Sequence, residues 1–235
     1  MQRNDQALYR DYAISMWKGT YRFQRLLAQQ VNPRLEYFDR VVHDWKGFSV
    51  LDLGCGGGFM AEALTKRGAN IIGIDPSPDM LKTAREHAKT GRLNITYKEG
   101  TGEAIPLGRD SVDCVVCVDV LEHVQDIGKV ISEIARVLQP GGIFFFDTIN
   151  RNWLSRFMAV TLVEDILRII PKGAHNPGKF IRPEELRLHL EQNGLKCADK
   201  FTGMKISRIN KNLDFEIGLT ASTKVMYIGH AVKAK

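Results

Sequence analysis

The sequence lacks the long apolar segments of exported and membrane-spanning proteins. Residues 1–19, MQRNDQALYRDYAISMWKG, contain no apolar core of the kind that a signal peptide needs. No uninterrupted apolar run along the chain approaches the roughly 18 residues at which a spanning helix is expected. We therefore expect a cytoplasmic protein.

Cysteine is also scarce, with four residues in 235. Cys114 and Cys117 have the C-x-x-C spacing of many metal sites, but the surrounding DCVVCVDV is typical of a buried strand. Side chains three positions apart on a strand point to opposite faces, so this pair cannot easily share a metal or a disulfide. The cysteines are expected to be core thiols in a reducing compartment.

Basic residues exceed acidic ones only moderately, by 33 to 27. The net charge of +6 is compatible with an anionic ligand, a nucleic acid or an anionic membrane surface, and does not choose among them. Internal repeats and low-complexity linkers are absent, and 44% hydrophobic residues exclude wholesale disorder. The length suits a single domain with a substantial core.

The sequence does contain a regular alternation of strand and helix patterns from Phe48 to Thr148. This alternation predicts a parallel sheet covered by helices on both faces, with a ligand beyond the carboxyl ends of its strands. Strands are predicted at 48–53, 70–75, 94–100, 111–120 and 143–148, then a helix at 183–194 and strands at 195–203 and 223–233. Polar residues stand at the predicted strand ends, namely Asp52, Asp75, Asp119 and Asp147.

A cluster of glycines follows the first strand. Gly54, Gly56, Gly57 and Gly58 fall within five positions, whereas a turn alone needs one or two, so a ligand is expected to approach the backbone closely. A dinucleotide fingerprint would need a third spaced glycine where Phe59 stands, and a P-loop would need a lysine that is missing. Both kinds of site are therefore disfavoured.

Acidic residues further along suit a nucleoside. Asp75 ends the second strand, where a carboxylate can accept both ribose hydroxyls and would repel the 2′-phosphate of NADP. Glu103 and Ala104 follow the third strand, where an adenine could lie. Taken alone, a residue such as Glu103 is more often just a solvated loop acid.

Five segments in order, VLDLGCGGG, GIDPSPDML, GEAIPL, DCVVCVDVLEHV and RVLQPGG, resemble the motifs of the class I S-adenosylmethionine (SAM)-dependent methyltransferases. The resemblance implies a Rossmann-like α/β fold, with a seven-stranded, mostly parallel sheet of order 3-2-1-4-5-7-6 and one antiparallel strand. It also implies that the glycine loop receives the methionine part of SAM and Asp75 the ribose. The implied cofactor-binding residues are Arg34, Asp52, Gly54, Gly56, Gly58, Asp75, Glu103, Ala104 and Val118.

Arg34, in NPRLEY, resembles the arginine of the family that contacts the cofactor's carboxylate, although it also fits a surface position on an N-terminal helix. The flanks VNPRLEYF, NRN, PKG-x-H and KFI-x-P resemble the ubiquinone-biosynthesis O-methyltransferases. That resemblance implies methyl transfer to a catechol hydroxyl of a polyprenylated ubiquinone precursor, with other quinone-biosynthesis proteins as partners. The paired WWD of this family is replaced by SMWKG and the C-terminal strand differs, which leaves the exact quinone substrate open.

The segment VDVLEHV places Asp119, Glu122 and His123 within five positions at the end of the fourth strand. Two carboxylates and an imidazole can bind a divalent cation, and oxygen ligands suit Mg²⁺ best. The resemblance favours such a metal site. Metal-free catalysis with His123 as general base is the alternative, and acids that merely stabilise a helix N-terminus are a third interpretation.

We divide the single domain, residues 1–235, into a helical cap (1–47), a SAM-binding core (48–149), an insertion over the acceptor site (150–182) and a C-terminal helix with strands (183–235). In the insertion, Trp153 to Lys172 mixes apolar residues with arginine and lysine. This pattern fits a core-packed helix pair or an element lying in a membrane interface. The resembling family is peripherally membrane-associated through this insertion, which implies an anionic surface, that of the inner membrane, as a partner.

Other functions are weaker. The nearest rival is a methyltransferase for another small phenolic or lipid-like acceptor. Phe59 weakens a nucleotide-binding oxidoreductase, and the intact Asp119–Glu122–His123 cluster argues against a non-catalytic SAM-binding module. DVLEHV stands where a base methyltransferase would carry an Asn/Asp-Pro-Pro-aromatic motif, so no nucleic-acid partner is expected.

Overall fold

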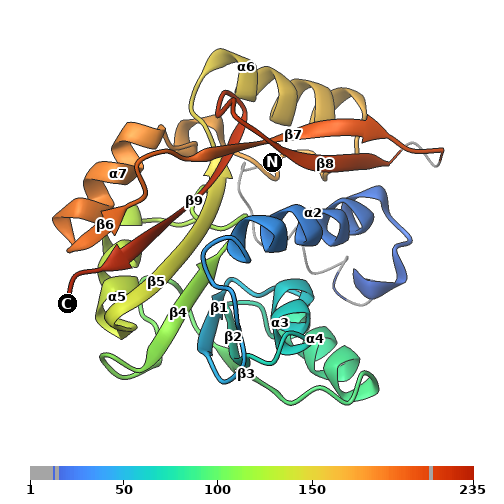
Figure 1. The fold of residues 1–235 in the computed structure, drawn as a ribbon. Coiled ribbons are helices and arrows are strands. Elements are labelled where there is room, and N and C mark those ends of the chain that lie inside the picture. The colour runs from blue at the N-terminus through green and yellow to red at the C-terminus, as the bar shows by residue number, and fades with distance from the viewer. Residues whose placement is uncertain (1–12, 14–15, 212–213) are drawn as a thin grey trace.

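A single mixed sheet runs through the computed structural model, which describes residues 13, 16–211 and 214–235 (Figure 1). The helical pattern predicted for residues 1–12 lies outside the described residues. The described N-terminal elements are the short helix η2 (Met16–Lys18) and the helix α2 (Arg22–Phe38). Residues 39–48 contain turns and no helix, so the predicted helical cap ends at Phe38.

The predicted alternation of strands and helices is confirmed in the core. Its elements are β1 (Ser49–Leu53), α3 (Phe59–Thr65), β2 (Asn70–Asp75), α4 (Pro78–Thr90), β3 (Ile95–Glu99), β4 (Val112–Cys117), α5 (Ile127–Val137) and β5 (Leu138–Ile149). Helix α4 begins with a side-chain cap, because the Ser77 side chain accepts a hydrogen bond from the Met80 N–H and Pro78 occupies the first position. The strand predicted at 143–148 begins earlier in the structure, at Leu138, and the β4–β5 register shifts between Leu138 and Ile143.

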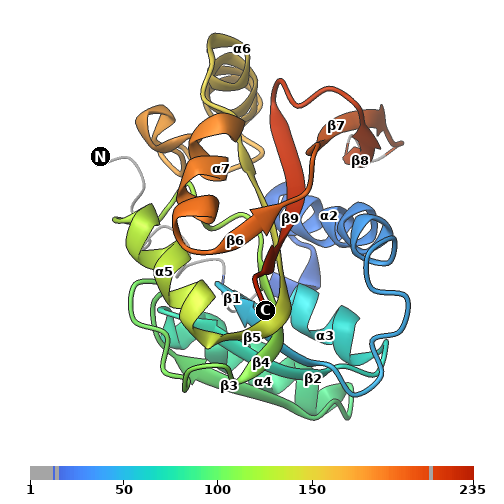
Figure 2. The same ribbon diagram turned by 60° about the vertical axis from the view of Figure 1, so that its left-hand side comes forward.

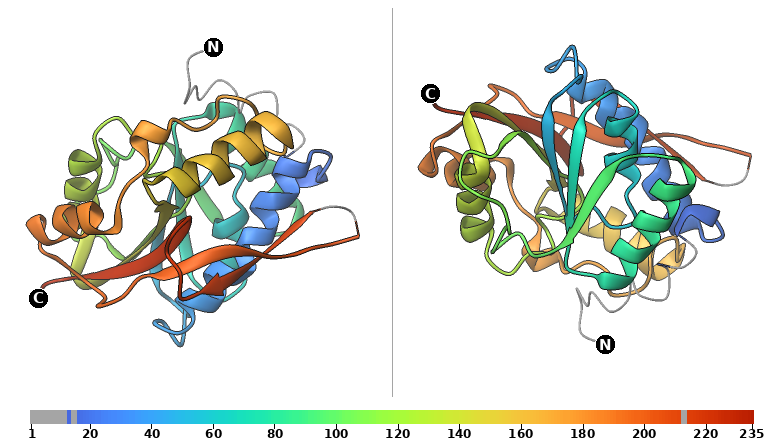
Figure 3. Two further views of the ribbon diagram at one scale, coloured as in Figure 1. Left: turned by 90° about the horizontal axis from the view of Figure 1, so that it is seen from above. Right: turned by 90° about the horizontal axis from the view of Figure 1, so that it is seen from below.

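The remaining elements are the helices of the insertion, one C-terminal helix and the strands that extend the sheet beyond β5. They are α6 (Trp153–Arg156), the π-helical η3 (Phe157–Ile166), η4 (Pro177–Lys179), α7 (Pro183–Gln192), β6 (Leu195–Cys197), β7 (Thr202–Ile209), β8 (Phe215–Thr220) and β9 (Met226–Lys233). Seen from above, the segment that begins with α6 crosses the end of the sheet, with α2 and the β7–β8 hairpin beside it (Figure 3).

The Rossmann-like class is confirmed, but the prediction of seven strands is wrong. The described residues form nine strands in the order β3-β2-β1-β4-β5-β9-β7-β8, with β6 also pairing with β9. The strand predicted at 195–203 is split into β6 and β7, and the β8 strand extends the sheet by a hairpin. Both β9 and β8 run against the parallel strands, because β9 is antiparallel to β5 and β7, and β8 is antiparallel to β7.

The sheet buries both faces under helices, as the continuous apolar strands require (Figure 2). On one face α5 and α7 contribute Ile131, Ile134 and Leu186. On the other, α2, α3 and α4 contribute residues such as Phe38, Leu64 and Leu81.

The predicted burial of the cysteines in the core is confirmed by this arrangement. Cys114 packs into the core on the α2–α3–α4 face and Cys117 into the core on the α5–α7 face. Cys55, Cys114, Cys117 and Cys197 are all buried free thiols. Among the described residues, no helix combines the length and apolarity needed to cross a bilayer.

Candidate active site

The carboxyl ends of the parallel strands open into a cavity of about 1050 Å³. Its walls come from the glycine loop after β1, the ends of β2 and β4, helix α2, the insertion and the β7–β8 hairpin. A typical small-molecule site spans roughly 300–1000 Å³, so this cavity has room for two bound molecules. It lies at the edge of the sheet where the alternating pattern predicts a ligand.

The glycine loop presents bare backbone to this cavity. Gly54 and Gly56 have positive φ angles of 73° and 49°, which side-chain-bearing residues adopt reluctantly. The N–H groups of Gly54 and Cys55 both donate to the Ile74 carbonyl, at 2.7 and 3.0 Å, which ties the loop to the end of β2. A Cβ at Gly54 would lie 2.2 Å from Val120, whereas one at Gly56 would meet nothing within 4 Å. Gly56 is therefore the position where a ligand can approach the backbone.

Helix η2 packs on the glycine loop, and its Met16 lines the same cavity. The Trp17 indole N–H donates to the Gly57 carbonyl at 2.7 Å, and a Cβ at Gly57 would lie only 2.6 Å from Met16. Glycine is needed at 57 because the N-terminal segment packs directly on the backbone there.

Asp75 is fixed at the cavity wall by two backbone N–H groups. Its carboxylate oxygens accept from Gly56 and from Ser77, each at 2.9 Å. Burial raises the pKa of Asp75 and these two hydrogen bonds oppose the rise. A carboxylate has further lone pairs beyond these two bonds, so Asp75 can still accept from a ligand.

Asp52 is held more deeply, at the end of β1, with 2% exposure. Within the described part of the chain, its Oδ2 atom has no hydrogen-bond partner. Burial raises the pKa of Asp52 to about 7, and Asp75 adds to the rise while the Ala61 backbone opposes it. A buried acceptor left in this state gains from a bound donor.

The other predicted cofactor residues occupy different positions. Val118 and Glu103 line the cavity, and the Glu103 carboxylate accepts from the Gln125 N–H at 2.9 Å. Ala104 is exposed and does not line the cavity. Gly58 starts α3 with a φ of 91°, and its missing side chain makes room for Tyr97. Cofactor contact by these four residues stays a prediction.

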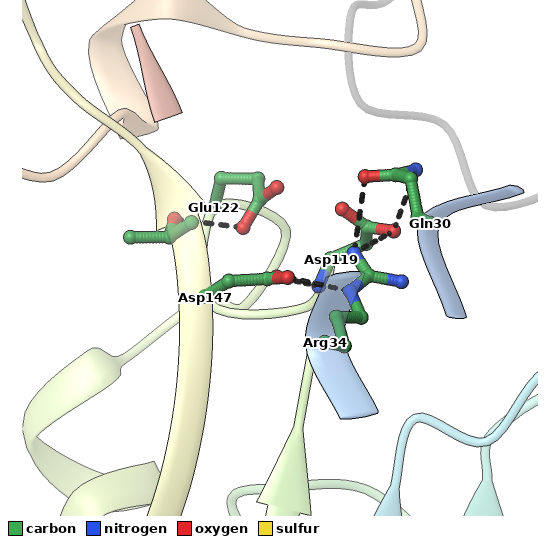
Figure 4. A network of polar contacts seen from close by, with 6 residues as sticks. Gln30, Arg34, Asp119, Glu122 and Asp147 are labelled. Carbon is green, nitrogen blue, oxygen red and sulfur yellow. Dashed lines mark hydrogen bonds and ion pairs between the residues drawn. The ribbon is translucent and has the colours of Figure 1, made fainter. Parts of the chain in front are cut away.

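Arg34 lies on α2 in a closed ring of charged groups, 3% exposed (Figure 4). Its Nε donates to Asp147 at 2.6 Å and a terminal nitrogen pairs with Asp119 at 2.6 Å. The Asp119 N–H in turn donates to the other oxygen of Asp147 at 2.8 Å. Asp119 adopts a positive φ of 55°, an uncommon conformation that this ring holds in place.

The ring also recruits Gln30, whose side chain bonds both Arg34 and Asp119. Burial acts to lower the pKa of Arg34, but Asp119 and Asp147 outweigh it and the pKa is raised. Burial raises the pKa of Asp147, with Arg34 opposing. Arg34 lines the cavity, and its contact with a cofactor carboxylate stays a prediction.

The predicted catalytic cluster is rearranged in the structure. Glu122 and His123 lie with His175, and one possible ligand atom from each falls within 4.8 Å of the others. Asp119 is engaged by Arg34 and is not part of this group. The His123 and His175 rings are 5.5 Å apart and inclined by 29°. The metal and base roles of these residues stay predictions.

Burial governs the protonation of this cluster. It raises the pKa of Glu122 to about 8, with Asp119 adding to the rise, while Thr148 donates to the Glu122 carboxylate at 2.8 Å. Burial and the neighbouring His175 lower the pKa of His123 to about 3. Burial therefore favours the uncharged form of both groups.

Sequence reasoning missed Gln30, Glu164 and His175. His175 is the histidine of the PKG-x-H segment, which contributes to the family resemblance, but nothing in the sequence indicates that it lies beside Glu122 and His123. Asp147 was noticed only as a polar strand end. Gln30 is four residues from Arg34 and Glu164 is eleven from His175, but the contacts that join separate elements are remote, since Arg34 and Asp147 are 113 positions apart.

A prediction follows from the charged ring. Arg34→Met should lower the free energy of unfolding by about 3–5 kcal/mol, because it leaves buried carboxylates uncompensated. Adding Asp147→Asn removes one of those charges and should restore part of the loss. Urea denaturation of the wild type, both single variants and the double variant measures this; strictly additive losses would contradict the coupling.

Comparisons with known proteins agree with the geometry. Residues 51–146 match the family model described as a methyltransferase domain. Among solved structures, the magnesium protoporphyrin IX methyltransferase of Synechocystis, crystallised with S-adenosylhomocysteine, has a TM-score of 0.68 at 22% identity, covering 98% of this chain and all of that one. The YcgJ protein of Bacillus subtilis has a TM-score of 0.64 at 16% identity, covering 86% of this chain and 98% of its own.

Curated relatives are more similar in sequence. The ubiquinone biosynthesis O-methyltransferase of Acinetobacter baylyi is 36% identical over 230 residues, which are 97% of this chain and 94% of that protein. The enzyme of the same name from Coxiella burnetii is 34% identical, covering 91% and 90%. That from Aliivibrio fischeri is 39% identical over 190 residues, 80% of each chain. The chain is therefore a SAM-dependent methyltransferase, and it belongs to the family of the ubiquinone biosynthesis O-methyltransferases.

Proposed function

We propose that this enzyme transfers the methyl group of SAM to a catechol hydroxyl of a polyprenylated ubiquinone precursor. One observation carries the proposal: a single cavity joins the glycine loop and Asp75, the Glu122–His123–His175 surroundings, and a long apolar arm. The apolar arm is lined by Phe23, Leu26, Leu27, Met158, Ala159, Val163, Met204, Ile206, Phe215 and Ile217. The family membership supports the same substrate class.

In this proposal the donor occupies the polar end of the cavity. Asp75 accepts the ribose hydroxyls, and the open backbone at Gly56 receives the methionine part. The unpartnered Oδ2 of Asp52 suits the donor's ammonium group. Glu103 lines the same wall, where the adenine amine is expected.

The reaction is a displacement at the methyl carbon. The bond from sulfur to methyl breaks as the bond from the catechol oxygen to methyl forms, and S-adenosylhomocysteine leaves. The hydroxyl must lose its proton, so a group beside it has to accept that proton or lower the hydroxyl's pKa. His123 lines the same cavity as the glycine loop and the apolar arm, and its neutral imidazole can act as an acceptor.

Glu122, His123 and His175 also have the composition of a divalent-cation site. Two imidazoles and one carboxylate suit zinc, iron or manganese better than Mg²⁺, which prefers oxygen ligands throughout. His175 pairs with the Glu164 carboxylate through Nδ1 at 2.7 Å, the support that metal-bound histidines usually have. A bound cation would lower the pKa of a catechol hydroxyl.

The insertion is proposed to rest on the membrane that holds the substrate. Four of the seven exposed large apolar side chains in the described part of the chain lie in it: Trp153, Phe157, Ile166 and Leu167. Arg156, Arg168 and Lys172 are exposed beside them. The opposite side of η3 lines the apolar arm through Met158 and Val163. One segment would thus touch the bilayer and receive the prenyl chain.

The donor site is tested by Asp75→Ala. Loss of charged hydrogen bonds to the ribose should weaken S-adenosylhomocysteine binding by about 1.5–3 kcal/mol in calorimetry. Asp79→Ala makes the same charge change on exposed surface four residues away and should bind as the wild type does. Equal affinity in the Asp75 variant would remove the ribose assignment.

The chemistry is tested with labelled SAM and a panel of short-chain prenyl catechols. His123→Ala should lower turnover by about 10²–10⁴-fold while S-adenosylhomocysteine still binds, because the loss concerns the acceptor's proton. His43→Ala, at an exposed position, is the matched control. Activity that EDTA abolishes and zinc or manganese restores supports the cation; EDTA-insensitive activity leaves His123 as a metal-free base. Wild-type turnover on none of the catechols would reject the proposed substrate.

The membrane contact is tested by co-sedimentation with anionic vesicles. The double variant Phe157→Asp, Leu167→Asp should lose binding, because each charge would enter the interface, and salt should weaken wild-type binding. Leu188→Asp, Ile209→Asp alters two exposed apolar side chains elsewhere with the same charge change. If both double variants sediment alike, the insertion is a substrate lid without membrane contact.

A further inference from the structure

Glu164 is a fully buried carboxylate on the side of η3 that faces the protein, with 0% exposure. Burying a charge is costly unless hydrogen bonds compensate for it. Three donors to it come from one short loop: Gly173 N–H at 2.9 Å, His175 N–H at 3.0 Å and His175 Nδ1 at 2.7 Å. The carboxylate therefore folds residues 173–175 back against η3.

These contacts decide the tautomer of His175. An ionised carboxylate can only accept, and both Glu164 oxygens already accept from backbone N–H groups. Nδ1 must then carry the proton that it donates to Glu164. In the neutral ring this leaves the lone pair on Nε2, the nitrogen with which His175 can take a proton or bind a cation.

The ring is also held in place from its sides. His175 is 8% exposed, with the Phe180 ring edge-on at 6.1 Å and the His123 ring at 5.5 Å. It lines the cavity together with His123. The two backbone N–H contacts to Glu164 suffice to hold residues 173–175 against η3. The third contact, from His175 Nδ1, additionally fixes the orientation of the imidazole ring within the cluster.

A second pair, between the buried Glu62 and the partly exposed His87, shows the contrast. Glu62 lies 2.6 Å from His87 Nδ1, but the His87 ring stacks on Trp17 at 3.5 Å and is 36% exposed. Neither residue lines the cavity. The same pairing therefore joins helices in one place and, at His175, orients a ring beside two other titratable groups.

We propose that Glu164 is a positioning residue: its carboxylate fixes the Nδ1–H tautomer and the orientation of His175, and so makes the folding of the insertion a condition for assembling the Glu122–His123–His175 cluster. The inference deepens the proposed function and rests on it for the identity of the cluster as the acceptor site. The tautomer and orientation of His175 can be tested without any methyl acceptor.

The test compares Glu164→Gln with Glu62→Gln in the full chain. Nitrogen NMR of ¹⁵N-histidine-labelled protein, without acceptor, reads the tautomer, and His175→Gln assigns the signal. The wild type should show Nδ1 protonated and Nε2 unprotonated. Glu164→Gln should lose this pattern, because an amide offers only one acceptor oxygen for three donors, whereas Glu62→Gln should leave the His175 signal unchanged.

Kinetics supply the second readout. In Glu164→Gln, kcat should fall about 10–100-fold, the usual effect of losing such a supporting partner, while S-adenosylhomocysteine affinity is retained. An unchanged His175 tautomer, or a kcat loss explained entirely by unfolded protein, would overturn the inference. A wild type that methylates no catechol yet shows the expected tautomer would reject the proposed function and leave the positioning role intact.

Discussion

The ion pair between the Arg34 guanidinium and the Asp119 and Asp147 carboxylates is the contact on which the site depends. It joins α2 to the ends of β4 and β5, three elements far apart in the chain. Each partner left alone would be an uncompensated charge in a poorly solvated place, so α2 has one favourable position. That position matters twice, since α2 carries Gln30 into the ring and Phe23, Leu26 and Leu27 into the apolar arm.

Glu164 repeats this arrangement on the opposite wall. The proposed donor end is built by the sheet, its loops and η2, through contacts such as those between Gly56 and Asp75 and between Trp17 and Gly57. The proposed acceptor end is covered by α2 and the insertion, and each of these is attached through a buried carboxylate. Polar contacts suit this task because they are directional, whereas the apolar surfaces of the arm would tolerate several arrangements.

The parts that sequence could predict are those with local signals. The strand–helix alternation, the Ser77–Pro78 helix start and the glycine loop each depend on neighbouring residues. The β7–β8 hairpin is not among the predicted strands, although Phe215, Ile217 and Leu219 in β8 alternate with polar residues or glycine. The alternation is short, and most side chains of the hairpin are half exposed or exposed, so the apolar signal of a buried strand is weak there. The grouping of His175 with Glu122 and His123 was missed for another reason: it depends on how the insertion folds over the sheet, and no residue spacing encodes that.

The dry surroundings of the cluster connect substrate and chemistry. An apolar arm that accepts a lipid tail must exclude water, and the same exclusion raises the pKa of Glu122 and lowers that of His123. Glu122 and His123 therefore carry little charge beside the apolar arm. A neutral imidazole retains the lone pair that accepts a proton or binds a cation, whereas an imidazolium would have lost it. In the proposed function, the desolvation that suits a prenylated acceptor thus also keeps His123 unprotonated, and its low pKa, which makes it a weak base, favours the cation-binding role.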